Sequence, residues 1–248
     1  MKGSDKSIIQ AAGLIANASH LVAFTGAGIS VESGIPPFRG DGGIWSQYDP
    51  SSLEIEHFTS DPCGSWKVIA EIFYQYFQEA EPNGAHLFLA RLERKGMLRA
   101  VITQNIDNMH QKAGNSEVIE YHGNSQWLVC SECGERYDIS MVSLDPLPPR
   151  CAADRHVLKP DFVFFGEGIP PAAARRSVEE VSMADLLLII GTTGEVMPAG
   201  MLPSIARSNG AKVIEINPKP SGYTYAITDV FLQGPAGEIA EQLDSYLF

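Results

Sequence analysis

The chain has 248 residues, 44% of them hydrophobic, with 18 basic and 30 acidic side chains and a net charge of −12. This acidity argues against a non-specific nucleic-acid binder, which needs a basic face, so no direct nucleic-acid binding is expected. No segment reaches the ~18 apolar residues of a membrane span, so no membrane association is expected. We expect a cytosolic protein, in which the four cysteines are thiols or metal ligands rather than disulfides.

Residues 1–20 predict an amphipathic helix with Ile8, Ala12 and Ile15 on one side. Four later apolar runs have the length of strands and do not alternate, which is typical of strands buried on both faces of a parallel sheet. Helical patterns lie between these runs, and the alternation predicts an α/β layered fold. The strand runs are 21–26, 98–105, 185–193 and 211–217, and the helical patterns cover roughly 62–79, 84–95, 171–183, 199–208 and 236–246.

Two stretches, 39–80 and 124–160, do not fit this alternation and are predicted to be insertions into the α/β domain. The second stretch holds three of the four cysteines. A fold of this class favours a site in the cleft between such insertions and the carboxyl edge of the sheet.

The first strand run ends in a glycine turn, "VAFTGAGISVESGIPPFRG", at residues 22–40. Gly26 and Gly28 let backbone amides approach a pyrophosphate next to a helix N-terminus. The third glycine of a dinucleotide-binding turn is replaced by Val31, and no acidic ribose ligand follows at the usual distance. Taken alone, these glycines also fit a plain tight turn. A cofactor, if present, is held in a non-standard way, which disfavours hydride transfer.

Four later segments join this turn in a recognisable order. They are "TQNIDNMHQKAG" at 103–114, "EYHGN" at 120–124, "KPDFVFFGE" at 159–167 and "GTTGEVMPA" at 191–199. With "GAGISVESGIPPFRG" before them, the chain resembles the sirtuins, the NAD-dependent protein-lysine deacylases. The resemblance runs from about residue 7 to residue 245.

The resemblance implies a Rossmann-like parallel-sheet domain with a helical insertion and a small zinc-ribbon-like module. The domain would comprise 1–39, 84–122 and 166–248. The insertion, with a cofactor-binding loop, would be 40–83, and the module 123–165. We expect a monomer.

In such a protein NAD is a substrate, cleaved at the bond between nicotinamide and ribose. The resemblance assigns phosphate or ribose contacts to the glycine turn after the first strand run, to the segment that begins at Gly191 and to strand ends. It assigns the nicotinamide pocket to Ile106 and Asp107. It assigns the acyl-lysine peptide to the backbone of Val163, Phe164, Phe165, Gly166 and Glu167, by strand addition. The full set of implied cofactor-binding residues is Gly26, Ala27, Gly28, Ser30, Phe38, Arg39, Gln104, Asn105, Ile106, Asp107, Gly191, Thr192, Thr193 and Asn217.

Catalysis is assigned to His122 and Asn105. The acetyl oxygen would attack ribose C1′ as nicotinamide leaves, and His122 would then activate the neighbouring hydroxyl, because histidine titrates near neutral pH. Water would complete the release of lysine and O-acetyl-ADP-ribose.

Each of these residues also has an ordinary structural explanation. Asn105 and Asp107 favour helix N-caps. Phe38 could pack on the core, and Arg39 could be a surface charge. His86 and His110 are expected on helix surfaces.

Cys130 and Cys133 form a C-x-x-C pair, and Cys151 follows after 17 residues, a spacing that matches a zinc ribbon. The fourth ligand of a sirtuin zinc module would be a cysteine at position 154, where this chain has Asp154. Asp154 could bind through oxygen, His156 through nitrogen, or the module could be held by packing. Zinc here would be structural rather than catalytic.

Other positions also depart from the family pattern. Pro37 replaces an aspartate in the cofactor loop, and Gly194 replaces a larger apolar residue, which predicts a looser wall on the adenosine side. Sirtuins that remove acidic acyl groups carry Tyr-x-x-Arg, whereas here Tyr74 is followed by Phe77. Acetyl or longer apolar acyl groups are therefore expected rather than succinyl or malonyl.

Two other functions stay open from the sequence. A protein mono-ADP-ribosyltransferase would share the first step of the reaction, but an intact His122 favours deacylation. A non-catalytic NAD or ADP-ribose binding module would be expected to have lost some of Arg39, Asn105, Asp107 and His122, and all four are present.

Overall fold

The computed structural model describes residues 3–39, 42–74 and 80–248. Its centre is a six-stranded sheet in the order β3-β2-β1-β7-β8-β9, and every neighbouring pair is parallel. The two halves of the sheet run outward from β1 and β7, which is the doubly wound arrangement. The strands are β1 (Leu21–Thr25), β2 (Leu98–Thr103), β3 (Val118–Glu120), β7 (Leu186–Ile190), β8 (Lys212–Asn217) and β9 (Val230–Gln233).

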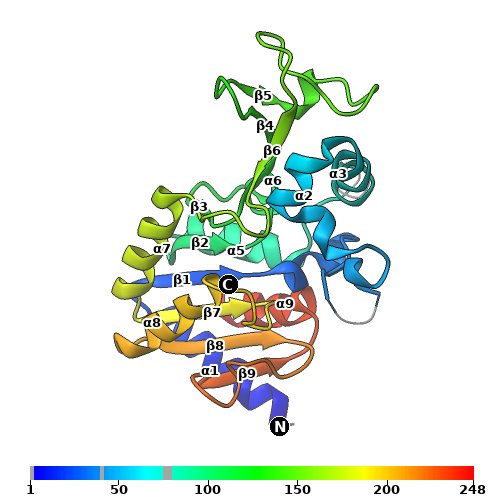
Figure 1. Ribbon diagram of the computed structural model, residues 1–248. Coiled ribbons are helices and arrows are strands. Elements are labelled where there is room, and N and C mark those ends of the chain that lie inside the picture. The colour runs from blue at the N-terminus through cyan, green and yellow to red at the C-terminus, as the bar shows by residue number, and fades with distance from the viewer. Residues whose placement is uncertain (1–2, 40–41, 75–79) are drawn as a thin grey trace.

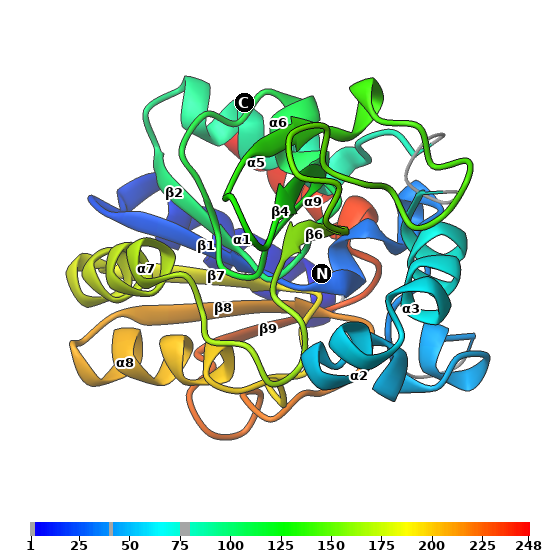
Figure 2. The same cartoon turned by 45° about the horizontal axis from the view of Figure 1, so that its top comes forward.

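Helices cover both faces of this sheet (Figure 2). One apolar cluster joins the sheet to α1 (Gly3–Asn17), α5 (Gly84–Arg94) and α9 (Ala236–Leu247). A second cluster on the other face joins it to α7 (Pro171–Met183) and α8 (Leu202–Ser208). All residues of β1 and β7 are buried because both faces are covered, which explains their continuous apolar runs.

The predicted strand and helix runs correspond to β1, β2, β7 and β8 and to α1, α5, α7, α8 and α9. The sequence did not predict β3 and β9. These edge strands have three and four residues, which is too few for a clear hydrophobic pattern. The fold class is confirmed. In the described part of the chain no helix is long and apolar enough to cross a membrane.

Figure 1 shows a small sheet projecting from the end of the large sheet where β3 lies, with two helices beside it. It is antiparallel in the order β5-β4-β6, formed by β4 (Gly123–Cys130), β5 (Arg136–Asp138) and β6 (Leu158–Phe162). The helices are α2 (Ile55–Ser60) and α3 (Pro62–Ile69), followed by a π-helical turn, η4 (Ala70–Tyr74). The rest of the helix predicted at 62–79 lies outside the described residues.

A third apolar cluster packs this helical segment against the small sheet. Trp66 is fully buried there, and its indole Nε1–H donates to the Leu158 carbonyl oxygen at 2.8 Å. Short helices complete the chain: α6 (Met109–Ala113) and the 3₁₀ helices η1 (Ala27–Ser33), η2 (Ile44–Ser46), η3 (Pro50–Leu53), η5 (Ile139–Met141) and η6 (Ala199–Met201).

Candidate functional site

The glycine turn after β1 meets a second glycine turn after β7. The Gly28 N–H donates to the Gly191 carbonyl oxygen at 2.8 Å. A Cβ on Gly28 would lie 2.7 Å from Gly191 Cα, and a Cβ on Gly191 (φ +66°) would lie 2.2 Å from the Ile29 nitrogen. Both positions therefore require glycine, and the turns meet where the strand order reverses, the usual place for a ligand crevice.

Ser30, Asn105 and Asp107 form a buried hydrogen-bonded cluster beside the first turn. The Ser30 hydroxyl donates to Asp107 Oδ2 at 2.7 Å, and Asn105 Nδ2 donates to Ser30 Oγ at 3.1 Å. Asn105 Nδ2 also lies 3.2 Å from the Gly26 carbonyl oxygen. The cluster links the end of β2 to η1, so the predicted cofactor residues of two segments come together.

The Asp107 side chain bonds to the start of α6, although the N-cap residue of this helix is Asn108. Its Oδ1 accepts the Met109 N–H at 3.1 Å, while Oδ2 faces Ser30, and its contact with a cofactor stays a prediction. Burial raises the pKa of this carboxyl, and the hydrogen bonds from Ser30 and Met109 oppose the rise. Ile106, next to it, is buried in the third apolar cluster.

His122 lies at the same edge, directly before β4. Its Nδ1 is 3.0 Å from the Gln104 carbonyl oxygen. Because a carbonyl can only accept, Nδ1 carries the proton and Nε2 has the lone pair. Burial lowers the pKa of His122 below its ordinary value of 6.5, against a smaller opposing effect of the Gln104 hydrogen bond. No hydrogen bond to Nε2 comes from the described residues.

The opposite side of the glycine turns is formed by the ends of β7 and β8. Gln104 Nε2 donates to Thr192 Oγ1 at 3.1 Å, and Asn217 Nδ2 donates to the Thr192 carbonyl oxygen at 3.1 Å. Thr193 is exposed. The Tyr223 ring lies where a side chain at Gly194 would be, 2.6 Å from an added Cβ, so this wall is filled rather than loose.

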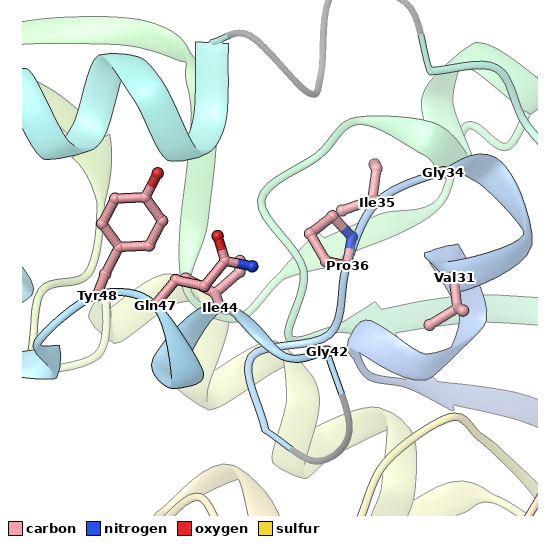
Figure 3. Close-up of a pocket in the computed structure, with 8 residues that line it drawn as sticks. All are labelled: Val31, Gly34, Ile35, Pro36, Gly42, Ile44, Gln47 and Tyr48. Carbon is pink, nitrogen blue, oxygen red and sulfur yellow. The ribbon is translucent and has the colours of Figure 1, made fainter.

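The segment after η1 bends away from the sheet. Phe38 is half-buried, with ring centroids 5.4 Å from Trp45 and 6.2 Å from Phe73, so it packs as an ordinary loop aromatic would. Arg39 is exposed. An open pocket of about 250 Å³ lies between the end of η1 and the segment that carries η2. Figure 3 shows the residues that line it. Its lining is Val31, Gly34, Ile35, Pro36, Gly42, Ile44, Gln47 and Tyr48.

Residues 163–167 connect three parts of the fold. The Val163 N–H donates to the His122 carbonyl oxygen at 2.8 Å, and the Phe165 N–H donates to the Leu53 carbonyl oxygen at 2.9 Å. Glu167 Oε2 accepts the Phe164 N–H at 2.8 Å and lies 2.9 Å from the Lys159 ammonium. The segment therefore lies next to the candidate base, but some of its backbone donors are already used within the chain.

Two histidines were predicted to lie on helix surfaces, and this prediction is wrong. His86 and His110 are 0% and 1% exposed, with ring centroids 5.0 Å apart. His110 Nε2 lies 3.0 Å from Thr25 Oγ1. Burial lowers the pKa of His86 to about 4 and that of His110 well below its ordinary value. The helical pattern of the sequence could not predict that these two polar residues are buried, because the groups that contact them come from distant segments of the chain.

Tyr74 is buried, and its hydroxyl donates to the Ser125 carbonyl oxygen at 3.0 Å. Phe77, the other half of the acyl-selectivity prediction, lies outside the described residues.

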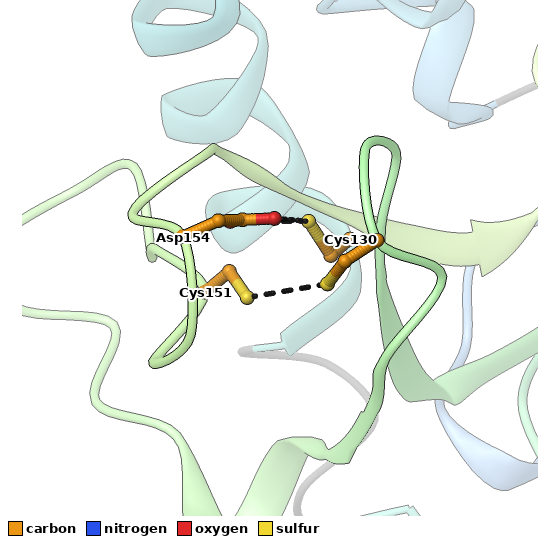
Figure 4. Close-up of side chains that lie close together, drawn as sticks. Cys130, Cys151 and Asp154 are labelled. Atoms are coloured by element: carbon orange, nitrogen blue, oxygen red, sulfur yellow. Dashed lines mark hydrogen bonds between the residues drawn. The ribbon is translucent and has the colours of Figure 1, made fainter.

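The three spaced cysteines gather in the small module (Figure 4). The Cys133 and Cys151 sulfurs are 3.7 Å apart, and Asp154 Oδ2 lies 3.3 Å from Cys130 Sγ. One ligand atom from each of the four residues lies within 4.8 Å of the others. His156 stays outside this set and contacts Asp154 instead: its backbone N–H donates to Asp154 Oδ1 at 3.0 Å, and its ring Nδ1 lies 3.4 Å from the same oxygen.

This geometry fits zinc. Bond lengths of about 2.3 Å to sulfur and about 2.0 Å to oxygen give tetrahedral edges of about 3.8 Å between sulfurs and about 3.5 Å between sulfur and oxygen. The Cys133–Cys151 and Cys130–Asp154 separations match these edges. The cluster is consistent with a structural zinc site. Cys63 lies apart in α3, and its thiol is free.

The model of the Sir2 family matches residues 26–198. The chain belongs to the Sir2 family, and the resemblance to sirtuins is confirmed. It is 45% identical to NAD-dependent protein deacylase 2 of Pyrobaculum aerophilum, over 94% of this chain and 92% of that protein. It is 42% identical to the NAD-dependent protein deacylase of Thermococcus sibiricus, over 95% of this chain and 94% of the relative.

Solved Sir2 structures also match the whole fold. A mutant Sir2 homologue in complex with ADP-ribose superposes with a TM-score of 0.92 and 39% identity, over 96% of this chain and 95% of that one. The structure of a Sir2 with a p53 peptide and NAD+ superposes with a TM-score of 0.89 and 34% identity, over 95% of this chain and 96% of that one.

Two buried residues near this edge of the sheet, Glu215 and Tyr223, were not found from the sequence. Glu215, in the middle of a buried strand run, is fully buried and accepts hydrogen bonds from the side chains of four residues. Tyr223 lies in a loop without a motif. The one available signal was a glutamate at an inward position of "KVIEIN", where a carboxylate must have partners.

Proposed function

We propose that this chain is an NAD-dependent protein-lysine deacetylase that consumes NAD and releases nicotinamide and O-acetyl-ADP-ribose. The observation that carries the proposal is the position and protonation of His122. Its ring is held by the Gln104 carbonyl at the sheet edge beside the Ser30–Asn105–Asp107 cluster. The names of the relatives, which are protein deacylases and deacetylases, support the same reaction.

His122 is suited to act as a base. Its lowered pKa keeps the ring neutral at pH 7, and the Nδ1–H bond to Gln104 leaves Nε2 free to take a proton from a ribose hydroxyl. The Gln104 carbonyl then stabilises the imidazolium that forms. Asn105 supports the same step, since its side chain fixes the Ser30 hydroxyl and the first glycine turn.

The arrangement of the edge suggests how NAD would lie. The pyrophosphate would lie at the two glycine turns, and the nicotinamide end near Ile106 and Asp107. The adenosine end would lie near Thr192, Thr193 and Asn217, while Phe38 and Arg39 would cover the reacting ribose. NAD supplies the electrophilic ribose carbon, and the chain's residues bind, orient and deprotonate.

The peptide would lie against residues 163–167, next to His122. The third apolar cluster and the aromatic residues around Phe38 favour an uncharged acyl group. Zinc, held by Cys130, Cys133, Cys151 and Asp154, would be structural. The described cysteines form no disulfide, which agrees with a cytoplasmic location, and we expect the enzyme to act as a monomer.

The test is incubation of the purified protein with NAD and an acetyl-lysine peptide, with all products followed by mass spectrometry. We expect deacetylated peptide, nicotinamide and O-acetyl-ADP-ribose, and a loss of about 100-fold or more in His122→Ala. His20→Ala is the matched control, because His20 precedes β1 at the opposite edge of the sheet and pairs with Glu180.

The products separate the alternatives. Nicotinamide release with ADP-ribose attached to protein and the acetyl group retained would indicate the transferase. NAD binding without turnover, also with longer acyl peptides, would indicate a binding module. For the deacetylase, kcat/KM should rise with pH as His122 loses its proton, with the midpoint of the rise below pH 6.5, because burial lowers the pKa of His122 from 6.5.

A further inference from the structure

Glu215 is a fully buried carboxylate on β8 that accepts all its hydrogen bonds from neutral groups. Its Oε1 accepts from Asn217 Nδ2 at 2.9 Å and from the Ser221 hydroxyl at 2.5 Å. Its Oε2 lies 2.9 Å from Thr224 Oγ1 and 2.8 Å from Thr228 Oγ1. These donors are an amide and three hydroxyls, and all of them are neutral.

Glu215 fixes the orientation of the Asn217 amide. The nitrogen of this amide faces two oxygens, the Glu215 carboxylate and the Thr192 carbonyl oxygen at 3.1 Å. Both can only accept, so a flipped amide would place oxygen against oxygen, and the orientation follows from chemistry. Both N–H groups of Asn217 are used, and only Oδ1 remains.

Oδ1 of Asn217 is available to a ligand. It accepts no hydrogen bond from the described residues, and it is not among the buried side-chain atoms that lack a partner. It can therefore bind only a donor that comes from solvent or from a ligand at the carboxyl end of the sheet.

We propose that Glu215 determines the choice of dinucleotide: by fixing Asn217 as a pure acceptor, it makes the adenosine-ribose position accept a free hydroxyl and reject a 2′-phosphate. This inference rests on the proposed function, in which the adenosine ribose lies near Asn217. A ribose hydroxyl donates to Oδ1. A phosphate has no proton to donate at neutral pH, and its charge would approach the buried Glu215 carboxylate.

The inference is tested without turnover, by calorimetric titration of the zinc-loaded protein with ADP-ribose and with 2′-phospho-ADP-ribose. We expect the wild type to prefer ADP-ribose by about 100-fold, since an unpaired acceptor and a like charge act together. Equal binding of the two ligands by the wild type would overturn the inference.

Two variants test whether Glu215 and Asn217 cause the preference for ADP-ribose. Glu215→Gln removes the charge and the fixed amide, and should reduce the preference by about 10-fold, mainly through tighter binding of the phosphorylated ligand. Asn217→Ala keeps Glu215 but removes the acceptor. It should weaken ADP-ribose by about 10-fold and leave 2′-phospho-ADP-ribose nearly unchanged. If Glu215→Gln does not fold, the titration of Asn217→Ala still tests whether the Asn217 acceptor sets the preference.

Lys219→Ala is the matched control, because this exposed lysine follows Asn217 by two residues. It should leave the preference unchanged. A larger change in Lys219→Ala than in Glu215→Gln would show that nearby charge sets the choice, and the inference would be wrong.

Failure of the two proposals can be told apart. A wild type that binds ADP-ribose and consumes NAD, but whose preference survives both Glu215→Gln and Asn217→Ala, contradicts only the inference about Glu215. A wild type that binds neither ADP-ribose nor NAD contradicts the proposed function and the inference with it.

Discussion

The cofactor edge of the large sheet and the small cysteine module achieve order by different means. At the edge, buried strands β1 and β7 bring glycine turns and polar clusters together, with two apolar clusters behind them. The module has only three strands, and β5 has three residues, none of them fully buried. At the end away from the third apolar cluster it gathers three thiols and a carboxylate. Because the part around β5 has little apolar burial of its own, we expect it to depend on a metal crosslink, whereas the large sheet does not.

The largest difference between the two regions is expected when the metal is removed, which should destabilise the module and leave the large sheet folded. Cys151→Ser takes away a buried ligand, and we expect loss of bound zinc and about 3 kcal/mol or more of local stability. Limited proteolysis should then cut within residues 131–157 while fragments of the large sheet survive. Cys63→Ser, outside the cluster, is the control and should keep its zinc. Cooperative loss of the whole fold in Cys151→Ser would show that the regions are not independent.

The edge should be most sensitive at its glycine contact. Gly191→Ala places a Cβ 2.2 Å from the Ile29 nitrogen at φ +66°, so backbone must move, and we expect about 4 kcal/mol of destabilisation. Urea denaturation measures the change. Gly96→Ala is the control, since Gly96 has φ +71° with no atom within 4 Å and should lose only the conformational part, about 1 kcal/mol. Equal losses would mean that contact between the turns is unimportant.

The buried histidines should make the large sheet sensitive to acid. The pKa of His86 is lowered from 6.5 to about 4, so its contribution to stability is complete above pH 6.5 and is lost as the pH falls toward 4. The loss is about 1.4 kcal/mol per pH unit. Urea midpoints between pH 7 and pH 5 should fall less steeply in His86→Gln, which keeps a residue suited to the capping box at the start of α5.

Because both proteins carry the same module, the difference between them isolates the histidine from acid effects on the metal ligands. Parallel pH slopes for wild type and His86→Gln would refute the assignment.

The smallest effect is expected in the module, where Asp154→Cys would complete a four-thiolate set. The donor separations already match a tetrahedral site, so little rearrangement is needed. We expect tighter zinc binding by about 10-fold, because thiolate is a softer ligand than carboxylate, measured by competition with a chelator. Deacetylase activity should not change. Weaker zinc binding would mean that the module is shaped around the carboxylate.

Much of this architecture could be predicted from the sequence. The continuous apolar runs of β1, β2, β7 and β8 determined a buried parallel sheet, since only strands covered on both faces lack alternation. The glycines, the C-x-x-C pair and His122 were recognisable because each belongs to a short local motif. That the glycine turns and His122 lie at one edge follows from the rule that ligands bind at the carboxyl ends of such strands, whereas the C-x-x-C pair lies in the small module. The roles of the individual site residues remain predictions.

Only the tertiary structure decided the rest. His86 and His110 became core residues because Ser30 and Thr25, far away in the chain, supply their partners. Tyr223 fills the space beside Gly194, and Ser221, Thr224 and Thr228 donate to the buried Glu215 from a loop with no motif of its own. A local pattern records which residues prefer to be buried. Whether a buried polar group is satisfied depends on donors and acceptors brought together by the fold.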